Sequence, residues 1–368
     1  MKITFLSPVD GDVMTPFDGK EEREGLIVDV TVEAPVGAAV TVNGTPASLN
    51  GGVYTAPVKL YGYRNTVVAR AEKDGETAEA KIALYRFKNA FMKYRLSVDD
   101  VIWSLEEVSN GDYRSLFDHP FFAIFKRLNE DFGTRVHMNL FYETEDGRFN
   151  LTMMPDTYKS EFEAASDWLK FTFHARANKP DRIYRFAPYE ELYRDYQKVT
   201  REIVRFAGEN AIKSAATGLH WGETTREGAR ALRAVGIRCL LGYFRFDKDG
   251  EPFVSYYLNR EETAHVAGRD FWVDTSEDII FAKDKFVIDR HTVKGIAPAL
   301  DDLKSRPHEA GTINFLVHEQ FFYPHYPKYL PDYEERIRTA IQWAHDNGYA
   351  PVLLDEAIAE DMALDFLK

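Results

Sequence analysis

The pattern of apolar residues changes at about residue 87, and this change restricts the possible folds more than any other feature. Before it, short β-branched stretches alternate with turn signals. After it, apolar runs of strand length alternate with charged segments of helical periodicity. The first pattern is typical of an antiparallel β-sandwich and the second of parallel strands with crossover helices. Because 368 residues can hold two cores, we predict a β-sandwich over residues 1–88 and an α/β domain over residues 89–368.

The first domain is predicted from five short strands and two tight turns. The pairs Asn43-Gly44 and Asn50-Gly51 readily adopt the positive φ angles of hairpin turns. The segment contains no histidine and no cluster of potential ligands, so we expect an accessory immunoglobulin-like domain. Its strands are expected near residues 25–32, 39–42, 52–55, 65–69 and 78–84.

The second domain is predicted to contain eight strands and several amphipathic helices. The pair Asn347-Gly348 supplies a stop signal for the last of the three clearest helices. These helices are expected near residues 189–208, 224–235 and 333–347. The strands are expected near residues 94–98, 136–142, 168–173, 214–218, 239–243, 271–273, 313–317 and 351–354.

The charge balance argues against a polyanionic partner. The formal net charge is −13, with 59 acidic against 46 basic residues, and no dense Lys/Arg run is present. Nucleic acid binding is therefore not expected. The N-terminal apolar run is too short for a signal peptide or a membrane span, so we expect a cytoplasmic protein, which could form an oligomer. The single cysteine, Cys239, lies in an apolar run and is expected to be a buried thiol.

Polar side chains of one kind follow several of the predicted strands. Asp99 and Asp100 follow the first strand, His174 the third, His220 the fourth and His318 the seventh. In parallel α/β folds the loops after the strands converge at one rim, where functional side chains gather. Three histidines and two carboxylates at the same rim indicate a functional site.

Adjacent carboxylates at a strand end suit metal-assisted hydrolysis, since one can bind a metal while its neighbour acts as a general base. An alternative interpretation is that Asp99 or Asp100 caps a helix over residues 101–108. His174 could likewise be a metal ligand or a buried imidazole whose hydrogen bonds are satisfied.

Four segments resemble the polysaccharide deacetylase superfamily in order and spacing. They are Leu96–Asp100, Phe173-His174, the turn Gly218–Glu223 before Thr224–Gly236, and Phe315–His318. The resemblance covers roughly residues 92–360. It implies a distorted (β/α) barrel of the carbohydrate esterase type that holds a divalent metal, expected to be zinc, and removes N- or O-acetyl groups from sugars.

The resemblance also implies roles for individual residues. Asp99 is similar to the catalytic base of the family and His318 to its general acid. Asp100 and His174 are similar to its metal-binding aspartate and first histidine ligand.

The sequence departs from the family at two positions. Asn178 stands where the family has its second histidine ligand, and Gly218–Gly222 replaces the segment that supplies an arginine to brace the base. One hypothesis is that His220 completes the metal site. In the same hypothesis, Arg176 braces the base or binds a substrate anion. The other substrate contacts are expected from two aromatic platforms and one carboxylate: Trp103, Trp221 and Glu319.

Three functions remain open at this point. The leading hypothesis is a metal-dependent hydrolase of a C–N or ester bond on a carbohydrate. The second is a non-catalytic sugar-binding protein on the same barrel. The third is a glycosidase that uses two carboxylates, such as Asp100 and Glu319. Only the first requires a metal, so chelation separates it from the others.

Overall fold

The computed structural model describes residues 1–212 and 214–367, which divide into two compact units. The first unit contains Met1–Phe91 together with Phe271–Ile280 and Ala357–Lys368. The second contains Met92–Asp270 and Phe281–Glu356. The end of the first long segment is three residues from the boundary expected at residue 88, and two distant segments also join the first unit.

The first unit is built from two five-stranded sheets that share one hydrophobic core. Strand β4 shows why: its even-numbered residues Leu26, Val28, Val30 and Val32 are buried, and the alternate side chains are more exposed. One sheet has the order β1-β4-β8-β7 with β3 also on β4, and the other has the order β2-β10-β9-β5-β6. All pairs are antiparallel except β2 with β10. The strands of the two sheets are β1 (Thr4–Ser7), β2 (Val13–Met14), β3 (Lys20–Glu22), β4 (Gly25–Glu33), β5 (Ala39–Val42), β6 (Thr45–Pro46), β7 (Ser48–Asn50), β8 (Val53–Leu60), β9 (Arg64–Lys73) and β10 (Glu76–Arg86). Strand β18 (Phe271–Asp274) also belongs to this unit but lies outside the two sheets.

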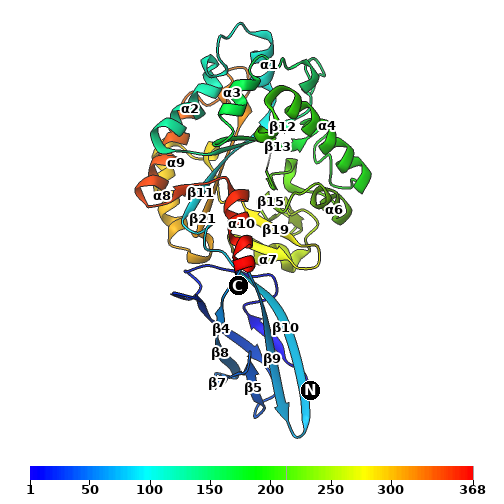
Figure 1. Ribbon diagram of the computed structural model, residues 1–368, viewed down its shortest axis with the longest axis vertical. Helices are drawn as coiled ribbons and strands as arrows, with labels where there is room; N and C mark the ends of the chain where they lie inside the picture. The colour runs from blue at the N-terminus through cyan, green and yellow to red at the C-terminus, as the bar shows by residue number, and fades with distance from the viewer. Residues whose placement is uncertain (213, 368) are drawn as a thin grey trace. The chain divides into compact units, whose positions relative to one another are not determined.

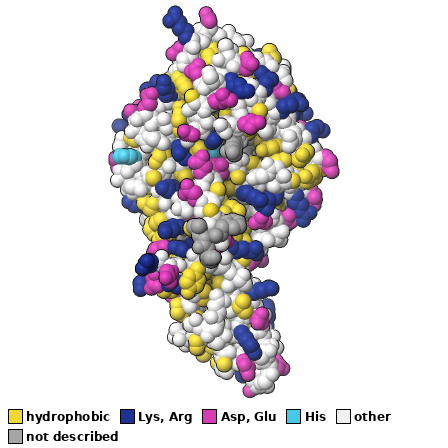
Figure 2. All heavy atoms as spheres, viewed as in Figure 1, with side chains coloured by type: hydrophobic (Ala, Val, Ile, Leu, Met, Phe, Trp, Pro, Cys, Tyr) yellow, Lys and Arg dark blue, Asp and Glu magenta, His cyan; other side chains and the backbone are white. Residues whose placement is uncertain are grey.

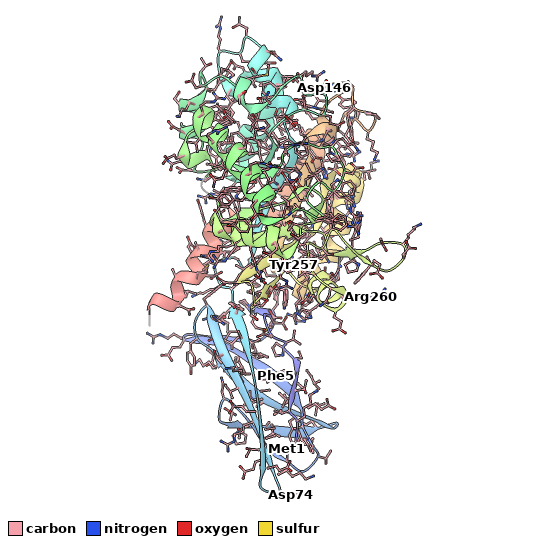
Figure 3. All side chains as sticks on the ribbon, turned by 90° about the vertical axis from the view of Figure 1, so that its right-hand side faces the viewer. Met1, Phe5, Asp74, Asp146, Tyr257 and Arg260 are labelled. Atoms are coloured by element: carbon pink, nitrogen blue, oxygen red, sulfur yellow. The ribbon has the colours of Figure 1, made fainter. Side chains whose placement is uncertain are left out.

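The hairpin turns of this unit have the backbone that their residues favour. Asn43 and Gly44 both have positive φ, 47° and 78°, as predicted for a tight turn. The next turn lies one residue later than expected, because positive φ is found at Gly51 and Gly52. Asp74 lies at the tip of the β9–β10 hairpin (Figure 3). The immunoglobulin-like relationship stays a prediction, since two sheets around one core are common to many folds.

The second unit is organised around a parallel sheet of order β13-β12-β11-β21-β20, with β22 also on β11. The central strands are buried on both faces, as expected for a parallel sheet covered by helices. Strands β14 and β15 form a second parallel pair. The strands of this unit are β11 (Lys93–Val101), β12 (Val136–Phe141), β13 (Leu169–Ala175), β14 (Ala216–Thr217), β15 (Cys239–Gly242), β16 (Arg245–Phe246), β17 (Pro252–Phe253), β19 (Ile279–Lys283, of which the first two residues fall in the first unit), β20 (Phe286–Val287), β21 (Thr312–His318) and β22 (Ala350–Pro351).

The expected (β/α) barrel is present only in part, because the strands of the described residues form separate sheets and not one closed ring. One interruption lies between β13 and β14. Strand β14 has only two residues, and the hydroxyl of Thr217 donates a hydrogen bond to the Phe173 carbonyl where a ladder would continue. The predicted α/β class is therefore correct, while the closed barrel is not observed.

Amphipathic helices surround the sheets of the second unit (Figure 1). In α4 the buried residues Leu192, Tyr196, Val199 and Ile203 recur every three or four positions, which places them on one face. Among the described residues, no helix combines the length and apolar character needed to cross a bilayer. The helices are α1 (Trp103–Asn110), α2 (Pro120–Phe132), α3 (Lys159–Ala164), α4 (Tyr189–Ala207), α5 (Glu209–Ile212), α6 (Arg226–Ala234), α7 (Arg260–Ala267), α8 (Val293–Lys304), α9 (Tyr333–Asp346) and α10 (Leu354–Ala363).

Acidic and basic side chains are interspersed on the face shown in Figure 2.

Cys239 is buried, as predicted, and burial raises the pKa of its thiol.

Candidate metal centre and catalytic pocket

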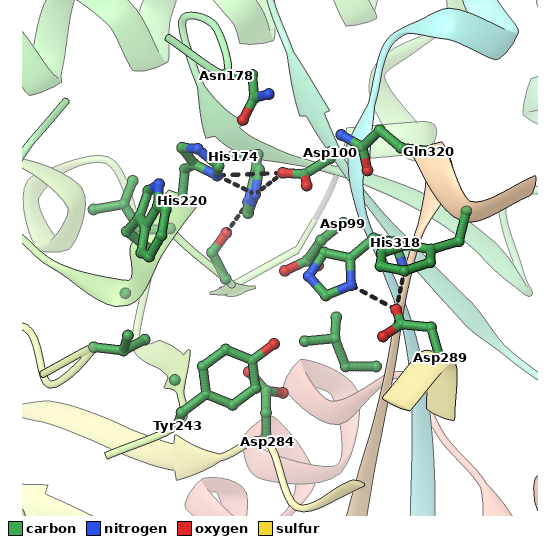
Figure 4. Close-up of a pocket in the computed structure, with 18 of the residues that line it drawn as sticks. Asp99, Asp100, His174, Asn178, His220, Tyr243, Asp284, Asp289, His318 and Gln320 are labelled. Carbon is green, nitrogen blue, oxygen red and sulfur yellow. Dashed lines mark hydrogen bonds and ion pairs between the residues drawn. The ribbon is translucent and has the colours of Figure 1, made fainter. Parts of the chain in front are cut away.

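The predicted strand ends meet at one pocket of about 650 Å³ in the second unit (Figure 4). Asp99 and Asp100 come from the end of β11, and His174 comes from β13. His220 lies in a short turn of 3-10 helix after β14, and His318 is the last residue of β21. The parallel ladder between β11 and β21 pairs residue 99 with residue 318, so this register alone sets Asp99 beside His318.

A β-bulge explains why two adjacent aspartates reach the same pocket. In a regular strand, neighbouring side chains point to opposite faces. Here Val98 pairs with Met138 but Val101 pairs with Leu140, so β11 carries one extra residue. The stretch between Val98 and Val101 includes Asp100, whose φ of 66° lies in the left-handed region. The strained backbone lets Asp100 line the pocket together with Asp99.

Asp100, His174 and His220 form a cluster with the spacing of metal ligands. Asp100 Oδ1 lies 3.0 Å from His174 Nε2 and 3.2 Å from His220 Nδ1, and the two imidazole nitrogens are 3.2 Å apart. Ligands about 2.0–2.1 Å from a tetrahedral zinc ion are about 3.3 Å from one another. One carboxylate and two imidazoles therefore fit a divalent cation, as a catalytic zinc site with three protein ligands requires.

The surroundings of His174 leave its inner nitrogen available as a ligand. Its Nδ1–H donates to the carbonyl oxygen of Gly218, so Nε2 is the ring nitrogen that faces Asp100 and His220 and would bind a cation in place of its proton. Burial by itself raises the pKa of Asp100, but hydrogen bonds from His174 and His220 outweigh it and hold this pKa well below its usual value. The carboxylate is thus ionised, as a metal ligand must be.

Asn178 lines the pocket, but its amide nitrogen donates to Glu145 and not to the cluster. His220, from a different loop, stands with Asp100 and His174 in its place. This arrangement supports the hypothesis that His220 completes the ligand set, a role that remains to be tested.

Asp99 is held by neutral donors from its own strand β11 and from the neighbouring strand β12. Its Oδ1 accepts hydrogen bonds from the Ser97 hydroxyl at 3.0 Å and from the Asn139 amide. The same amide reaches Ser97 at 2.8 Å, and its oxygen accepts from Thr172. The hydrogen bonds from Ser97 and Asn139 both fix the Oδ1 atom of Asp99. Asp99 is 8% exposed and lines the pocket. Sequence reasoning missed these positioning residues, although polar residues inside apolar strands were a visible signal.

His318 is bound to a carboxylate that sequence reasoning did not identify. Its Nδ1 lies 2.6 Å from Asp289 Oδ2, which also accepts the His318 backbone N–H at 3.0 Å. Burial alone lowers the pKa of His318, but the negative charge of Asp289 outweighs it and raises the pKa to about 9. His318 is therefore protonated at neutral pH. Asp289 lies beyond the two-residue strand β20, which is too short to appear as a pattern in the sequence.

Arg176 and Glu319, two of the expected substrate contacts, do not line the pocket. Arg176 faces Glu143, with 3.5 Å between Nε and the carboxylate. Glu319 is fully buried and accepts the backbone N–H groups of Ile102, Trp103 and Ser104 at 2.7–2.8 Å. Glu319 thus caps α1, the role considered for Asp99 or Asp100, because the carboxylate reaches the unpaired N–H groups of its first turn.

We expect Glu319→Gln to destabilise the fold by about 1–3 kcal/mol, because an amide NH₂ would face backbone donors in a buried position. Denaturant unfolding, with the exposed Glu335→Gln as the control, measures this loss. If Glu319→Gln were as stable as the parent yet inactive, Glu319 would act in the chemistry and not as a cap.

The expected aromatic residues Trp103 and Trp221 do line the pocket. Trp103 packs edge-on against Tyr323, with ring centroids 5.4 Å apart. Trp221 has a φ of 63°, a strained conformation for a bulky residue, and its buried Nε1 has no hydrogen-bond partner among the described residues. Strain and an unpaired donor are both typical of functional positions.

Comparison with known proteins gives no family assignment. No family model matches the chain, and no curated protein matches it. Among solved structures, a β-glucuronidase from Parabacteroides merdae superposes over 86% of this chain and 46% of its own, with 10% identity and a TM-score of 0.29. A candidate α-galactosidase from Bacteroides fragilis superposes over 94% and 78%, with 12% identity and a TM-score of 0.28.

An endo-β-1,4-mannanase from Thermotoga petrophila superposes over 23% of this chain and only 19% of its own, with 15% identity and a TM-score of 0.18. The chain thus spans about a fifth of the length of the first structures it matches. All these TM-scores lie below 0.5, so the superpositions carry no conclusion about fold or function.

Proposed function

We propose that the protein is a metal-dependent hydrolase that removes an N- or O-acyl group from a carbohydrate. The observation that carries this proposal is the convergence of three ligand-type atoms, on Asp100, His174 and His220, beside the strand-paired residues Asp99 and His318. An aspartate base and a protonated histidine flanking a cation site are the parts that acyl transfer to water requires.

In the proposed reaction, Asp100, His174 and His220 would hold a divalent cation, expected to be zinc. When bound, the cation would act as a Lewis acid toward the acyl carbonyl. Asp99 accepts the proton of the attacking water through the oxygen that Ser97 and Asn139 leave free. His318, protonated and oriented by Asp289, donates its proton to the departing amine or alcohol.

The test combines elemental analysis with a product assay. Protein stripped with a chelator is expected to release no acetate from acetylated oligosaccharides, and added Zn²⁺ is expected to restore the release. The parent should bind about one metal per chain. Folded parent protein that takes up no metal, or that releases acetate equally well with chelator present, would contradict the proposal.

One observation favours a two-carboxylate glycosidase as a second candidate. Asp284 lines the pocket, and burial raises its pKa to about 8, with Arg95 opposing the shift from 3.8 Å and Asp99 adding to it. A protonated carboxyl beside a second carboxylate is the pairing that glycosidases use. The pair suggested by sequence, Asp100 with Glu319, is not assembled because Glu319 caps α1. A glycosidase would release reducing sugar in the presence of chelator and lose that activity in Asp284→Asn.

We expect Trp103→Ala to raise KM about 10-fold with a smaller change in kcat, because the ring offers a stacking face for a sugar in the pocket. Initial-rate kinetics on acetylated oligosaccharides measure this. Phe186→Ala, which removes an 81% exposed aromatic side chain, is the control and should leave KM unchanged. Unchanged KM in Trp103→Ala would place the sugar elsewhere in the pocket.

A further inference from the structure

Two arginines that no carboxylate of the described residues neutralises line the same pocket as the cation site. The guanidinium carbons of Arg245 and Arg290 both lie 5.4 Å from the centre of the Tyr243 ring. Arg245 also lies 4.8 Å from the centre of the Phe253 ring. Stacking on aromatic rings holds the two positive groups close together without cancelling their charge.

Hydrogen-bond donors at this place also lack partners among the described residues. The Nε–H of Arg245 is buried and unpaired, and so is the hydroxyl of Tyr243. Burial, followed by the positive charge of Arg290, lowers the pKa of Arg245. Leaving a buried donor unpaired costs about 1–3 kcal/mol. Two like charges and two unpaired donors in one place are the complement of an anion that binds there.

The acidic residues of the pocket do not supply that anion. Asp100 is hydrogen-bonded to the two histidines, and Asp289 pairs with His318. Asp181 pairs with Lys179 at 2.7 Å. Asp99 accepts hydrogen bonds from Ser97 and Asn139, and Glu145 accepts one from Asn178. Asp284 has its pKa raised by burial to about 8 and is mostly uncharged at neutral pH. Among the described residues, Arg245 and Arg290 thus remain positive groups available to a ligand, together with Lys328 of the pocket lining.

We propose that Arg245 and Arg290, with the Tyr243 hydroxyl, form an anion subsite beside the cation centre, so that the carbohydrate bound in this pocket carries an oxyanion. Carboxylate, sulfate and phosphate groups all offer the paired oxygens that guanidinium groups bind. This inference rests on the proposed function for the removal of the acyl group. The binding of an acidic ligand at the subsite does not depend on that reaction.

The experiment uses matched ligands that differ only in charge. An acetylated tetrasaccharide with uronic acid units is compared with its carboxyl-reduced counterpart, with sulfated and phosphorylated forms as further arms. Calorimetry measures binding, and acetate release is followed in parallel. We expect at least about 10-fold tighter binding of one acidic form, weakened by added salt because charges are screened.

Arg245→Gln and Arg290→Gln are each expected to reduce this preference at least about 5-fold. Arg201→Gln, which makes the same change on the exposed face of α4 outside the pocket, is the control and should retain it. Thermal unfolding shows whether each variant is folded, and charge preservation in Arg290→Lys should restore part of the preference.

The outcomes separate this inference from the proposed function. Preferred binding of an acidic form without acetate release would support the subsite and contradict the hydrolase. Equal binding of acidic and neutral forms, with no effect of either arginine variant, would overturn the subsite even if acetate is released. The acidic arm that binds best identifies the oxyanion.

Discussion

His220→Ala is expected to lower the affinity for Zn²⁺ more than about 100-fold, because even residues that only orient ligands contribute 10- to 100-fold. The Nδ1 atom of His220 lies 3.2 Å from both Asp100 Oδ1 and His174 Nε2. Without the His220 imidazole, only Asp100 and His174 remain as ligands. Acetate release should fall with the metal content. Competition with a chromophoric chelator gives the affinity.

Asn178→Ala is the matched control, since position 178 is where the deacetylase superfamily has its second histidine. The Asn178 amide donates to Glu145, so its loss should leave zinc affinity within about 3-fold of the parent. The opposite result, with Asn178→Ala losing zinc and His220→Ala keeping it, would show that the ligand set follows the family spacing and not the cluster described above.

Asp289→Asn is expected to reduce acetate release at pH 8 about 30-fold. The Asp289 carboxylate is the main reason that the pKa of His318 rises to about 9, so without it that pKa should fall to its ordinary value of about 6.5 or lower. The protonated fraction of the acid at pH 8 then falls from about nine tenths to about three hundredths. The alkaline limb of the pH–rate profile, measured from pH 5 to 10, should move down by at least about 2.5 pH units.

The same pair affects stability with a definite sign. Because the folded pKa of His318 lies above its unfolded value, the pair stabilises the fold fully below about pH 6.5, and this contribution is lost as pH rises through about 9. Denaturation curves of the parent and Asp289→Asn should therefore differ most at pH 6 and converge above pH 9. An alkaline limb that stays near pH 9 in Asp289→Asn would exclude His318 as the group that titrates.

Much of the fold could be predicted because it depends on local patterns. The strands β11, β12, β13 and β21 and the helices α4, α6 and α9 lie within a few residues of their expected ranges. Whether the strands close into one ring could not be predicted, since closure depends on strands as short as β14 and β20. Two residues contain no periodicity, and their pairing is decided by tertiary contacts.

The residues of the candidate site that follow buried strands could be predicted. Their partners from neighbouring strands could not, because those contacts depend on how the strands pair. Asp99, Asp100, His174, His220 and His318 were identified as residues after buried strands, and the fold brings them together. Partners contributed across the sheet were missed.

Asn139 contacts Asp99 because β12 lies beside β11, and Asp289 contacts His318 because β20 lies beside β21. Glu319 was predicted to contact the substrate, but its carboxylate caps α1, and which helix end lies near a given carboxylate is decided by the tertiary fold.

The bulge at the end of β11 couples the orientations of Asp99 and Asp100, because both side chains reach the pocket through it. The left-handed backbone at Asp100 is tolerated by Asp, Asn and Gly and is costly for β-branched residues. A β-branched replacement at position 100 would therefore favour a straight strand and turn residue 99 as well, so base and ligand would be lost in one step. Asp100→Asn removes the charge while keeping the backbone, whereas effects of bulkier substitutions at the two positions would not add.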